Sequence, residues 1–337
     1  MKSRIIACIV LLLSANIAFA QSSSLAFASG ESKKGYAKIF GNINTVCNSV
    51  VPLKEVNTTG GLDNITTLVD KGATVGISQI DTWQSLAGGD EAVGRLKAVV
   101  SLNYNLMHIV VQKDGFKAGR ECTGKEAFGK CIAGDWKPVM KVIESETDLV
   151  GLTVAAVGSA QVLARTYLNK KLKLGVIVDD VDAKPNRSGD QIAFDKLKAG
   201  QVHAVITMAA YPAGPTSVGG LKPSDGLTLA NFTQQGGGGY RVVKKNYKNI
   251  GAFNVPFLAV PNILWARPVD PNGPAGQQIT ALKGCLVANL KKFQDSEEFE
   301  PSWADATLVL PDDVPVWTGV MASTPAPISV ETPTKRK

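Results

Sequence analysis

The chain has 337 residues, of which 45% are hydrophobic and 19% charged, and it carries a formal net charge of +7. This composition is that of a globular protein, and the length is sufficient for about two domains with buried cores. Two of the positive charges lie in the first four residues and three in the last three. The body of the chain is therefore nearly balanced, and a nucleic-acid partner is not expected.

Residues 1–20 have the pattern of a signal peptide. Lys2 and Arg4 precede an apolar run from Ile5 to Leu13, and Ala18-Phe19-Ala20 forms a small-x-small cleavage site. The alternative is a membrane anchor, but the apolar run is shorter than the roughly 20 residues that span a bilayer. The sequence predicts cleavage directly after this motif and a periplasmic location.

The cysteines fit an oxidising compartment. Cys8 leaves with the signal peptide, and the four others allow three pairings. Cys122 and Cys131 bracket a short polar loop and are the favoured local disulfide. Cys47 and Cys285 are then the remaining pair, and free buried thiols are the alternative for both. No redox, metal-ligand or cofactor-binding spacing is present, so we expect no cofactor and no metal.

The first part of the mature chain alternates strand and helix patterns. The predicted elements are a strand at 24–29, a glycine-bearing turn at 30–36 into a helix, a strand at 50–56, a helix from about residue 61, a strand at 73–79 and a helix that Asp81 or Thr82 caps. Such alternation is typical of a doubly wound α/β architecture.

The turn at Thr59-Gly60-Gly61 precedes one of these helices. The Thr59 hydroxyl is a suitable N-cap, and the two glycines have no side chain to keep a ligand away from the first amides of the helix. Those amides and the positive end of the helix dipole favour a carboxylate or phosphate. An ordinary capped surface helix is the alternative interpretation.

The middle of the chain contains two apolar runs and then a polar stretch. Residues 96–102 and 107–112 predict two strands separated by Asn103-Tyr104-Asn105, and residues 113–148 predict an irregular surface insertion. The pattern then restarts. The predicted elements are a strand at 152–157, a turn at 158–160, a helix at 161–168, a strand at 174–178, a helix that ends at Gly200 and a strand at 202–208.

The unit of helix, glycine and strand at 68–79 recurs at 192–208, which suggests two similar lobes. An apolar run at 257–265 predicts a last strand, and Leu282, Cys285, Leu286 and Leu290 predict a helix at 279–293. We expect the proline-rich end from Pro311 onward to be an edge segment at best, and disordered after about residue 323.

Several of these motifs occur together in one known family. They are the turn from Gly30 to Tyr36, the Thr59-Gly60-Gly61-Leu62-Asp63-Asn64 turn, the unit at 72–81, the strands at 96–112 with Ser101, Leu102, Tyr104 and His108, the second unit at 198–212 and the returning strand at 256–265. In these features the chain resembles the TAXI-type solute receptors, the periplasmic binding subunits of tripartite ATP-independent (TRAP) transporters. The resemblance covers most of residues 24–295.

The chain also departs from the family. Gly158-Ser159-Ala160-Gln161 replaces the usual Gly-Ser-Gly-Thr turn, and Thr74 and His203 stand where an acidic residue is usual. Residues 249–253 replace a tyrosine-containing segment. The resemblance therefore implies fold and role more strongly than the identity of the ligand.

The resemblance implies a two-lobed periplasmic binding protein of type II, with doubly wound sheets and a hinge between the lobes. The expected division is a signal peptide at 1–20, one lobe from 21–103 and 256–310, a second lobe at 104–255 with the insertion at 113–148, and a tail at 311–337. Strand ends then point at a cleft between the lobes, where a ligand binds.

The candidate ligand-binding residues come from the loops at these strand ends. They are Ser32, Tyr36, Thr59, Gly60, Gly61, Asn64, Gln79, Gly158, Ser159, Ala210 and Tyr211. Gln79 is the strongest side-chain candidate, because a polar residue that ends a buried strand needs a partner. Tyr36 is equally interpreted as a core residue and Tyr211 as a turn residue, while His108 is better interpreted as a core histidine than as a ligand.

The predicted function is capture of a small organic anion, a dicarboxylate or an amino acid, and its delivery to the membrane permease subunits of a TRAP transporter. A binding subunit of an ABC transporter or of a sensor kinase is the alternative within the same fold. An exported hydrolase is a third class, but the sequence has only two histidines and no GxSxG, HExxH or DxD-like cluster. We therefore expect a binding protein and not an enzyme.

Overall fold

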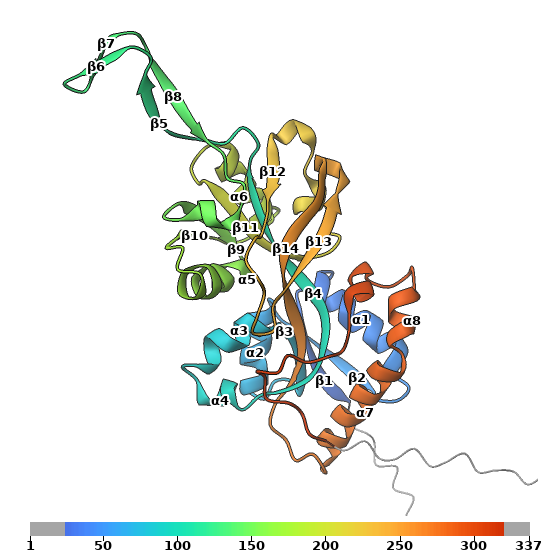
Figure 1. Cartoon of the computed structure of the whole chain (residues 1–337). Coiled ribbons are helices and arrows are strands. Elements are labelled where there is room, and N and C mark those ends of the chain that lie inside the picture. The colour runs from blue at the N-terminus through green and yellow to red at the C-terminus, as the bar shows by residue number, and fades with distance from the viewer. Residues whose placement is uncertain (1–23, 320–337) are drawn as a thin grey trace, which may run out of the picture.

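The computed structural model describes residues 24–319 and shows two lobes that share one sheet (Figure 1). The sheet has ten strands in the order β10-β9-β11-β4-β14-β3-β1-β2, with β12 paired to β4 and β13 paired to β14. Eight of the strands are short and each lies within a single lobe. They are β1 (Leu25–Gly30), β2 (Leu53–Asn57), β3 (Val75–Gln79), β9 (Thr153–Val157), β10 (Ile177–Val181), β11 (Ala204–Ala210), β12 (Leu227–Ala230) and β13 (Arg241–Tyr247).

Two long strands connect the lobes. They are β4 (Lys97–Gln112) and β14 (Ala252–Ala266), which pair antiparallel with each other. The prediction of two separate strands at 96–102 and 107–112 is therefore wrong. The intervening asparagines do not form a turn, because Asn105 pairs with Val260 of β14 and the Asn103 and Asn105 side chains both accept from the Asn262 amide.

The register of the sheet fixes where the shorter strands end. In lobe 1, Gln79 at the end of β3 pairs with Asn262, and β1 and β2 run parallel to β3. In lobe 2, Ala210 at the end of β11 pairs with Asn105, and β9 and β10 run parallel to β11. All six C-terminal strand ends therefore point at the middle of β4 and β14, which we call the junction.

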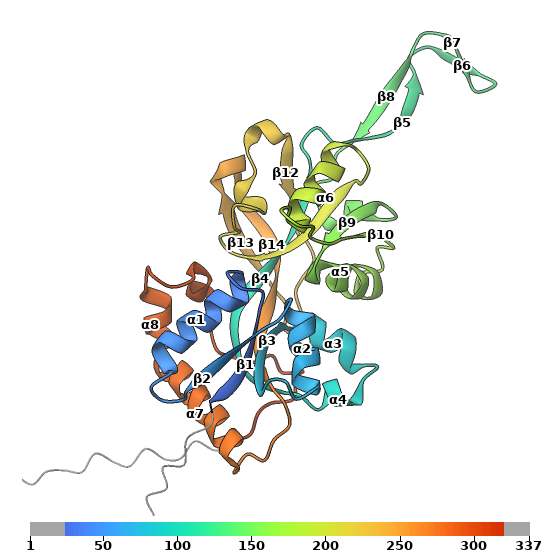
Figure 2. The same ribbon diagram turned by 180° about the vertical axis from the view of Figure 1, so that it is seen from behind.

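Helices cover both faces of each half of the sheet (Figure 2). In lobe 1 they are α1 (Gly35–Cys47), α2 (Gly61–Val69), α3 (Ile80–Ala87), α4 (Glu91–Gly94), α7 (Pro274–Ala288), α8 (Leu290–Asp295) and the 3-10 turn η7 (Pro301–Asp305). In lobe 2 they are α5 (Ser159–Leu163), its π-helical continuation η3 (Ala164–Lys171), α6 (Gly189–Lys198) and the 3-10 turns η2 (Glu146–Leu149), η4 (Val218–Gly220), η5 (Pro223–Asp225) and η6 (Lys248–Ile250). The α/β, two-lobed fold class with a hinge is thus confirmed.

The predicted helix at 279–293 is two helices, α7 and α8. The break lies at Asn289, whose backbone leaves the helical region with φ −111° and whose side-chain amide donates to the Cys285 carbonyl. Asparagine commonly ends a helix in this way, because its amide competes with the backbone for hydrogen bonds. The end of the chain then returns to the sheet, where Val316 bridges Ala98 at the start of β4.

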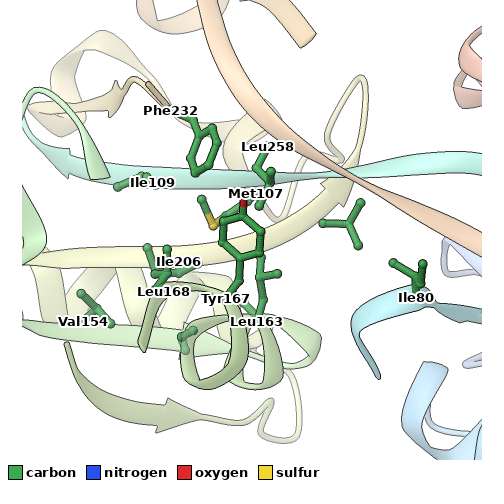
Figure 3. Packing of buried hydrophobic residues seen from close by; sticks show 14 of the residues in the cluster. Ile80, Met107, Ile109, Val154, Leu163, Tyr167, Leu168, Ile206, Phe232 and Leu258 are labelled. Carbon is green, nitrogen blue, oxygen red and sulfur yellow. The ribbon is translucent and has the colours of Figure 1, made fainter. Parts of the chain in front are cut away.

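Buried apolar residues form a core on each side of the sheet. One cluster lies under α1 and α7, where the Cys47–Cys285 disulfide joins these two helices. Another cluster runs through both lobes. In it Tyr167 and Phe232 point toward Met107, while Ile80 of α3 lies at the other end (Figure 3).

The insertion at 113–148 is not irregular. It forms a two-stranded ribbon, β5 (Phe116–Cys122) with β8 (Trp136–Lys141), extended by the hairpin β6 (Lys125–Ala127) with β7 (Lys130–Ala133). The ribbon projects from lobe 2 away from the rest of the molecule (Figures 1 and 2). The predicted Cys122–Cys131 disulfide lies within it.

None of the helices formed by residues 24–319 has the length and apolar character that crossing a bilayer requires. The predicted signal peptide and most of the proline-rich tail lie outside the described residues, so the structure does not test them.

Candidate functional site

Five helices begin at the junction, each in the loop that follows one of the strand ends. They are α1, α2, α3, α5 and α6. The Ser188 side chain caps α6, whereas the N-cap residues of the other four make no side-chain cap bond within the described part of the chain. The first turns of several helices thus present backbone N–H groups to the same region.

The turn before α2 brings its backbone close to β3. Gly60 has φ 142° and ψ −162°, which only glycine adopts readily, and it is the N-cap in place of the predicted Thr59. The Thr59 N–H and hydroxyl instead contact the Asp63 carboxylate, at 2.9 and 3.3 Å. A Cβ on Gly61 would lie 3.0 Å from the Ser78 hydroxyl, so a side chain at this position would push that hydroxyl aside.

Asn64 lies beside this turn but makes structural bonds. Its side chain accepts from the Thr58 hydroxyl at 2.5 Å and donates to the Ile77 carbonyl at 2.6 Å. These bonds hold α2 against β3. The proposed ligand role of Asn64 thus competes with two existing contacts.

The turn from β3 into α3 is the most unusual part of the junction. Ser78 Oγ, Gln79 Nε2, Asp81 Oδ2 and Thr82 Oγ1 are all buried and have no hydrogen-bond partner among the described residues. None of the four residues is more than 1% exposed. Leaving a buried polar atom unpaired costs about 1–3 kcal/mol, so this turn has more unsatisfied bonding capacity than its surroundings and is the strongest candidate for a ligand contact.

Asp81 is the charged member of this group. Burial raises the pKa of its carboxyl to about 7. The hydrogen bond from the Thr82 N–H, 2.9 Å from Oδ1, acts in the opposite direction and lowers the pKa. Burial and then the Asp81 charge also raise the pKa of Tyr36 and of Tyr240. Asp81 therefore lies within electrostatic range of both tyrosines.

Tyr36 reaches the crossing strands from the start of α1. Its hydroxyl donates to Asn262 Oδ1 at 2.9 Å, and the Asn262 amide donates to Asn103 and Asn105. The side chain is only half-buried. It is thus attached to the polar network of the hinge and not enclosed in the apolar core.

On the lobe 2 side the polar groups are mostly paired. Thr207 Oγ1 donates to Asp190 at 2.6 Å, and the Tyr211 hydroxyl donates to the Asn246 carbonyl at 3.0 Å. Burial raises the pKa of Asp190, and the Ser217 and Thr207 hydroxyls and, least of these, the charge of Lys34 from lobe 1 act in the opposite direction. Lys34 is thus within electrostatic range of Asp190.

Gly158 has φ 56° with open space where a Cβ would lie, and Ser159 begins α5 beside it. Ser32 is exposed in the turn before α1. The structure thus brings Tyr36, Gly60, Gly61 and Gln79 to lobe 1's edge of the junction and Gly158, Ser159 and Ala210 to that of lobe 2.

Tyr211 lies apart from this group. It lines a hollow of about 290 Å³ within lobe 2, together with Tyr247 and Asn249. A second hollow, of about 590 Å³, follows residues 232–242. Neither hollow is lined by Gly61 or Gln79.

Sequence reasoning missed the roles of Asp81, Thr82, Asn262 and Asp190. Asp81 and Thr82 stand directly after Gln79 in a strand-to-helix turn, and this position could have indicated a ligand as well as a helix cap. Asn262 gave no such signal, because its partner Tyr36 is 226 residues away in sequence.

The two histidines are occupied elsewhere. His108 is buried with Nε2 2.6 Å from the Tyr247 hydroxyl, and burial lowers its pKa to about 4, which agrees with its interpretation as a core residue. His203 packs against Phe116 and the Thr153 backbone. Among residues 24–319 no group of three or more His, Cys, Asp or Glu side chains is placed to hold a metal ion.

No family model and no curated protein matches the chain. Solved structures align with it at low identity. The GluR0 ligand-binding core in complex with L-glutamate is 12% identical, with 79% of this chain and 94% of that chain covered and a TM-score of 0.42. A periplasmic sulfonate-binding protein from Methylobacillus flagellatus KT is 13% identical, with 83% of this chain and 76% of that chain covered and a TM-score of 0.44. Tv2483 bound to L-arginine is 10% identical, with 86% of this chain and 94% of that chain covered and a TM-score of 0.48.

Proposed function

We propose that the protein is an extracytoplasmic solute-binding receptor that captures a small organic anion between its lobes and delivers it to the permease subunits of a TRAP transporter. The observation that carries this proposal is the set of unpartnered polar atoms at 78–82, buried at the point where the strand ends of both lobes converge. A ligand that paired with these atoms would offset the cost of burying them.

The contacts divide between the lobes. We assign the ligand carboxylate to the first turn of α2 at Gly60 and Gly61, near the Gln79 amide, and assign Tyr36 to its apolar part. Gly158 and Ser159 contact the ligand from lobe 2. Since β4 and β14 are the crossing strands, bending at their midpoint closes the lobes, and a ligand that contacts both lobes favours the closed state.

The lobe boundaries remain a proposal: residues 21–103 and 256–310 in lobe 1, residues 104–255 in lobe 2 and a tail at 311–337. The pairing of β14 would move the second crossing to about Val260, which lies opposite Asn105. We also propose cleavage of residues 1–20 and a periplasmic location. Mass spectrometry of the secreted protein tests the cleavage site.

The acidic residues at the junction favour an amino acid over a dicarboxylate. Asp63, Asp81 and Asp190 lie in the first turns of α2, α3 and α6. A second carboxylate on the ligand would be repelled by these groups, whereas an ammonium group would gain an acceptor in Asp81 Oδ2. A dicarboxylate remains the second candidate.

The experiment is a thermal-shift screen of residues 21–337 against amino acids and dicarboxylates, followed by two matched variants. Gly61→Ala places a Cβ 3.0 Å from Ser78 Oγ at the junction end of α2, and Gly72→Ala places one 3.1 Å from Thr67 Cγ2 beyond the far end of the same helix. We expect Gly61→Ala to abolish the ligand-induced shift and Gly72→Ala to retain it. If no small molecule raises the melting temperature, or if both variants behave alike, the proposal is wrong.

The alternative is a binding subunit for an ABC transporter or sensor kinase, which would use the same junction. A neighbouring gene for a large multi-span permease would favour the TRAP assignment. An exported hydrolase would instead turn over its ligand, and the His108–Tyr247 contact offers no base beside a nucleophilic serine.

A further inference from the structure

The ribbon formed by residues 116–142, here called the arm, takes no part in the candidate site. It projects from lobe 2 at the opposite end from lobe 1 (Figures 1 and 2). Its root is fixed, because Phe116 packs edge-on against His203 and the Lys113 N–H donates to the Gly226 carbonyl. The arm is a defined structure that does not contribute to the junction.

The arm is braced internally. The Cys122–Cys131 disulfide crosses it, and the Arg120 guanidinium lies 4.5 Å from the centre of the Trp136 ring. Thr123 also bonds the Asp135 backbone in both directions. These contacts join the two strands of a ribbon that has no apolar core of its own.

An aromatic residue occupies the tip. Phe128 is fully exposed, at 103%, and the neighbouring Ile132 is 65% exposed. Phe128 and Gly129 connect β6 to β7 with φ 51° and 69°, while Ala127 pairs with Lys130. Two-residue turns of this kind favour Asn-Gly or Asp-Gly, and a bulky residue with positive φ costs stability. The turn is thus less stable than one with Asn or Asp at this position, and it places an aromatic ring in solvent.

The arm also carries the excess positive charge of the described structure. Residues 24–319 contain 31 basic and 28 acidic residues. The arm contains 6 of the basic and 3 of the acidic residues, which leaves 25 basic and 25 acidic residues in the remainder. A neutral body thus bears a cationic projection, and the cations include Lys125 and Lys130 on either side of Phe128.

We propose that the arm docks on the anionic surface of a lipid bilayer. Phe128 and Ile132 enter the interfacial layer, while Lys125, Lys130 and the lysines along the ribbon contact the headgroups. Aromatic and aliphatic side chains beside flexible lysines suit this boundary, because the apolar parts leave water while the ammonium groups stay at the headgroups. Each lysine near an anionic leaflet adds attraction that salt weakens.

The test is co-sedimentation of residues 21–337 with vesicles of phosphatidylglycerol and phosphatidylcholine at 30:70, against vesicles of phosphatidylcholine alone. We expect at least fivefold more bound protein on the anionic vesicles, and loss of most of this excess in 0.5 M salt. Phe128→Ser/Ile132→Ser and Lys125→Gln/Lys130→Gln should each reduce binding at least threefold.

Two control variants make changes of the same kind on the body. Val309→Ser removes an exposed apolar side chain, 70% exposed, and Lys170→Gln/Lys184→Gln removes two exposed charges. Both should bind anionic vesicles like the wild type. Ligand-induced thermal shifts should be unchanged in the arm variants, so failure of this proposal is separable from failure of the receptor role.

Several outcomes would overturn the proposal. They are absence of vesicle binding, equal binding to neutral vesicles, and equal losses in arm and body variants. Arm-dependent binding to detergent-solubilised permease without any binding to vesicles would assign the arm to a protein partner instead.

Discussion

The ends of β3 and β11 occupy corresponding places in the two lobes, but their polar side chains differ in whether they have hydrogen-bond partners. At the end of β3, four buried polar atoms between Ser78 and Thr82 lack partners among the described residues. At the end of β11, Thr207 donates to Asp190 and Tyr211 to Asn246. Under the proposed function, the unpaired atoms after β3 are the ones available to a ligand, whereas the polar side chains at the end of β11 already have partners in the protein.

The largest effect is expected from Gln79→Leu. The variant removes a buried amide whose nitrogen is unpaired, so the free protein should become more stable by about 1 kcal/mol, while ligand affinity falls on the order of 100-fold because the amide contact is lost. Urea unfolding and calorimetric titration measure the two changes. Tyr167→Phe is the control, since it removes an unpaired buried hydroxyl in lobe 2, and affinity should not change. Loss of affinity in both variants would contradict the comparison.

Asp81→Asn should alter the pH dependence of stability. Burial raises the pKa of Asp81 from 3.8 to about 7, so the folded state binds the proton more tightly and wild-type stability falls as pH rises from about 4 to about 7. The variant keeps an oxygen acceptor for the Thr82 N–H but lacks this slope, and at pH 8 it should be more stable by roughly 2–4 kcal/mol.

Urea unfolding at pH 4, 6 and 8 measures this slope. Asp225→Asn provides a control of opposite sign, because the Lys198 bond lowers the pKa of Asp225 and its charged form therefore favours the folded state. A slope that survives in Asp81→Asn would show that another group titrates.

Thr207→Val tests the satisfied side of the comparison. The variant removes the donor to Asp190, so stability should fall by about 1–2 kcal/mol, while ligand affinity should change less than threefold. Urea unfolding and titration again separate the two. A larger loss of affinity than in Gln79→Leu would reverse the assignment of the lobes.

The smallest effect is expected from Lys34→Gln. Lys34 is within electrostatic range of Asp190, but its side chain is 58% exposed and also pairs with Glu31. Salt screens such exposed charges, so the variant should weaken ligand binding about twofold at low salt and not measurably at 0.5 M. Titration at two ionic strengths checks this, with Lys170→Gln as the control.

Periodicity predicted the elements of each lobe because their apolar faces follow local rules. The start of α2 at Gly61 and the strand from Val75 to Gln79 agree with the sequence interpretation. The continuous β4 was not predictable, because Asn103 and Asn105 are paired by Asn262 from a distant strand. The sequence predicted that Gln79 needs a partner, but only the structure shows that residues 24–319 supply none for its amide nitrogen.

The arm was missed for a related reason. Its strands have no apolar core, so the alternation that reveals a half-buried strand is weak there, and the disulfide takes over the stabilising role. A short polar stretch with two cysteines therefore resembles an irregular loop until its pairing is known.

The disulfide between Cys47 and Cys285 joins residues 238 positions apart, so the whole of lobe 2 lies between the two cysteines in the sequence. A protease that cut the arm or any loop of lobe 2 would thus leave two fragments that migrate as one species until a reductant is added. This disulfide cannot form until Cys285 has been synthesised and both thiols meet an oxidant. Lobe 1 is consequently the last part of the molecule to be completed, although its first strand is made near the beginning.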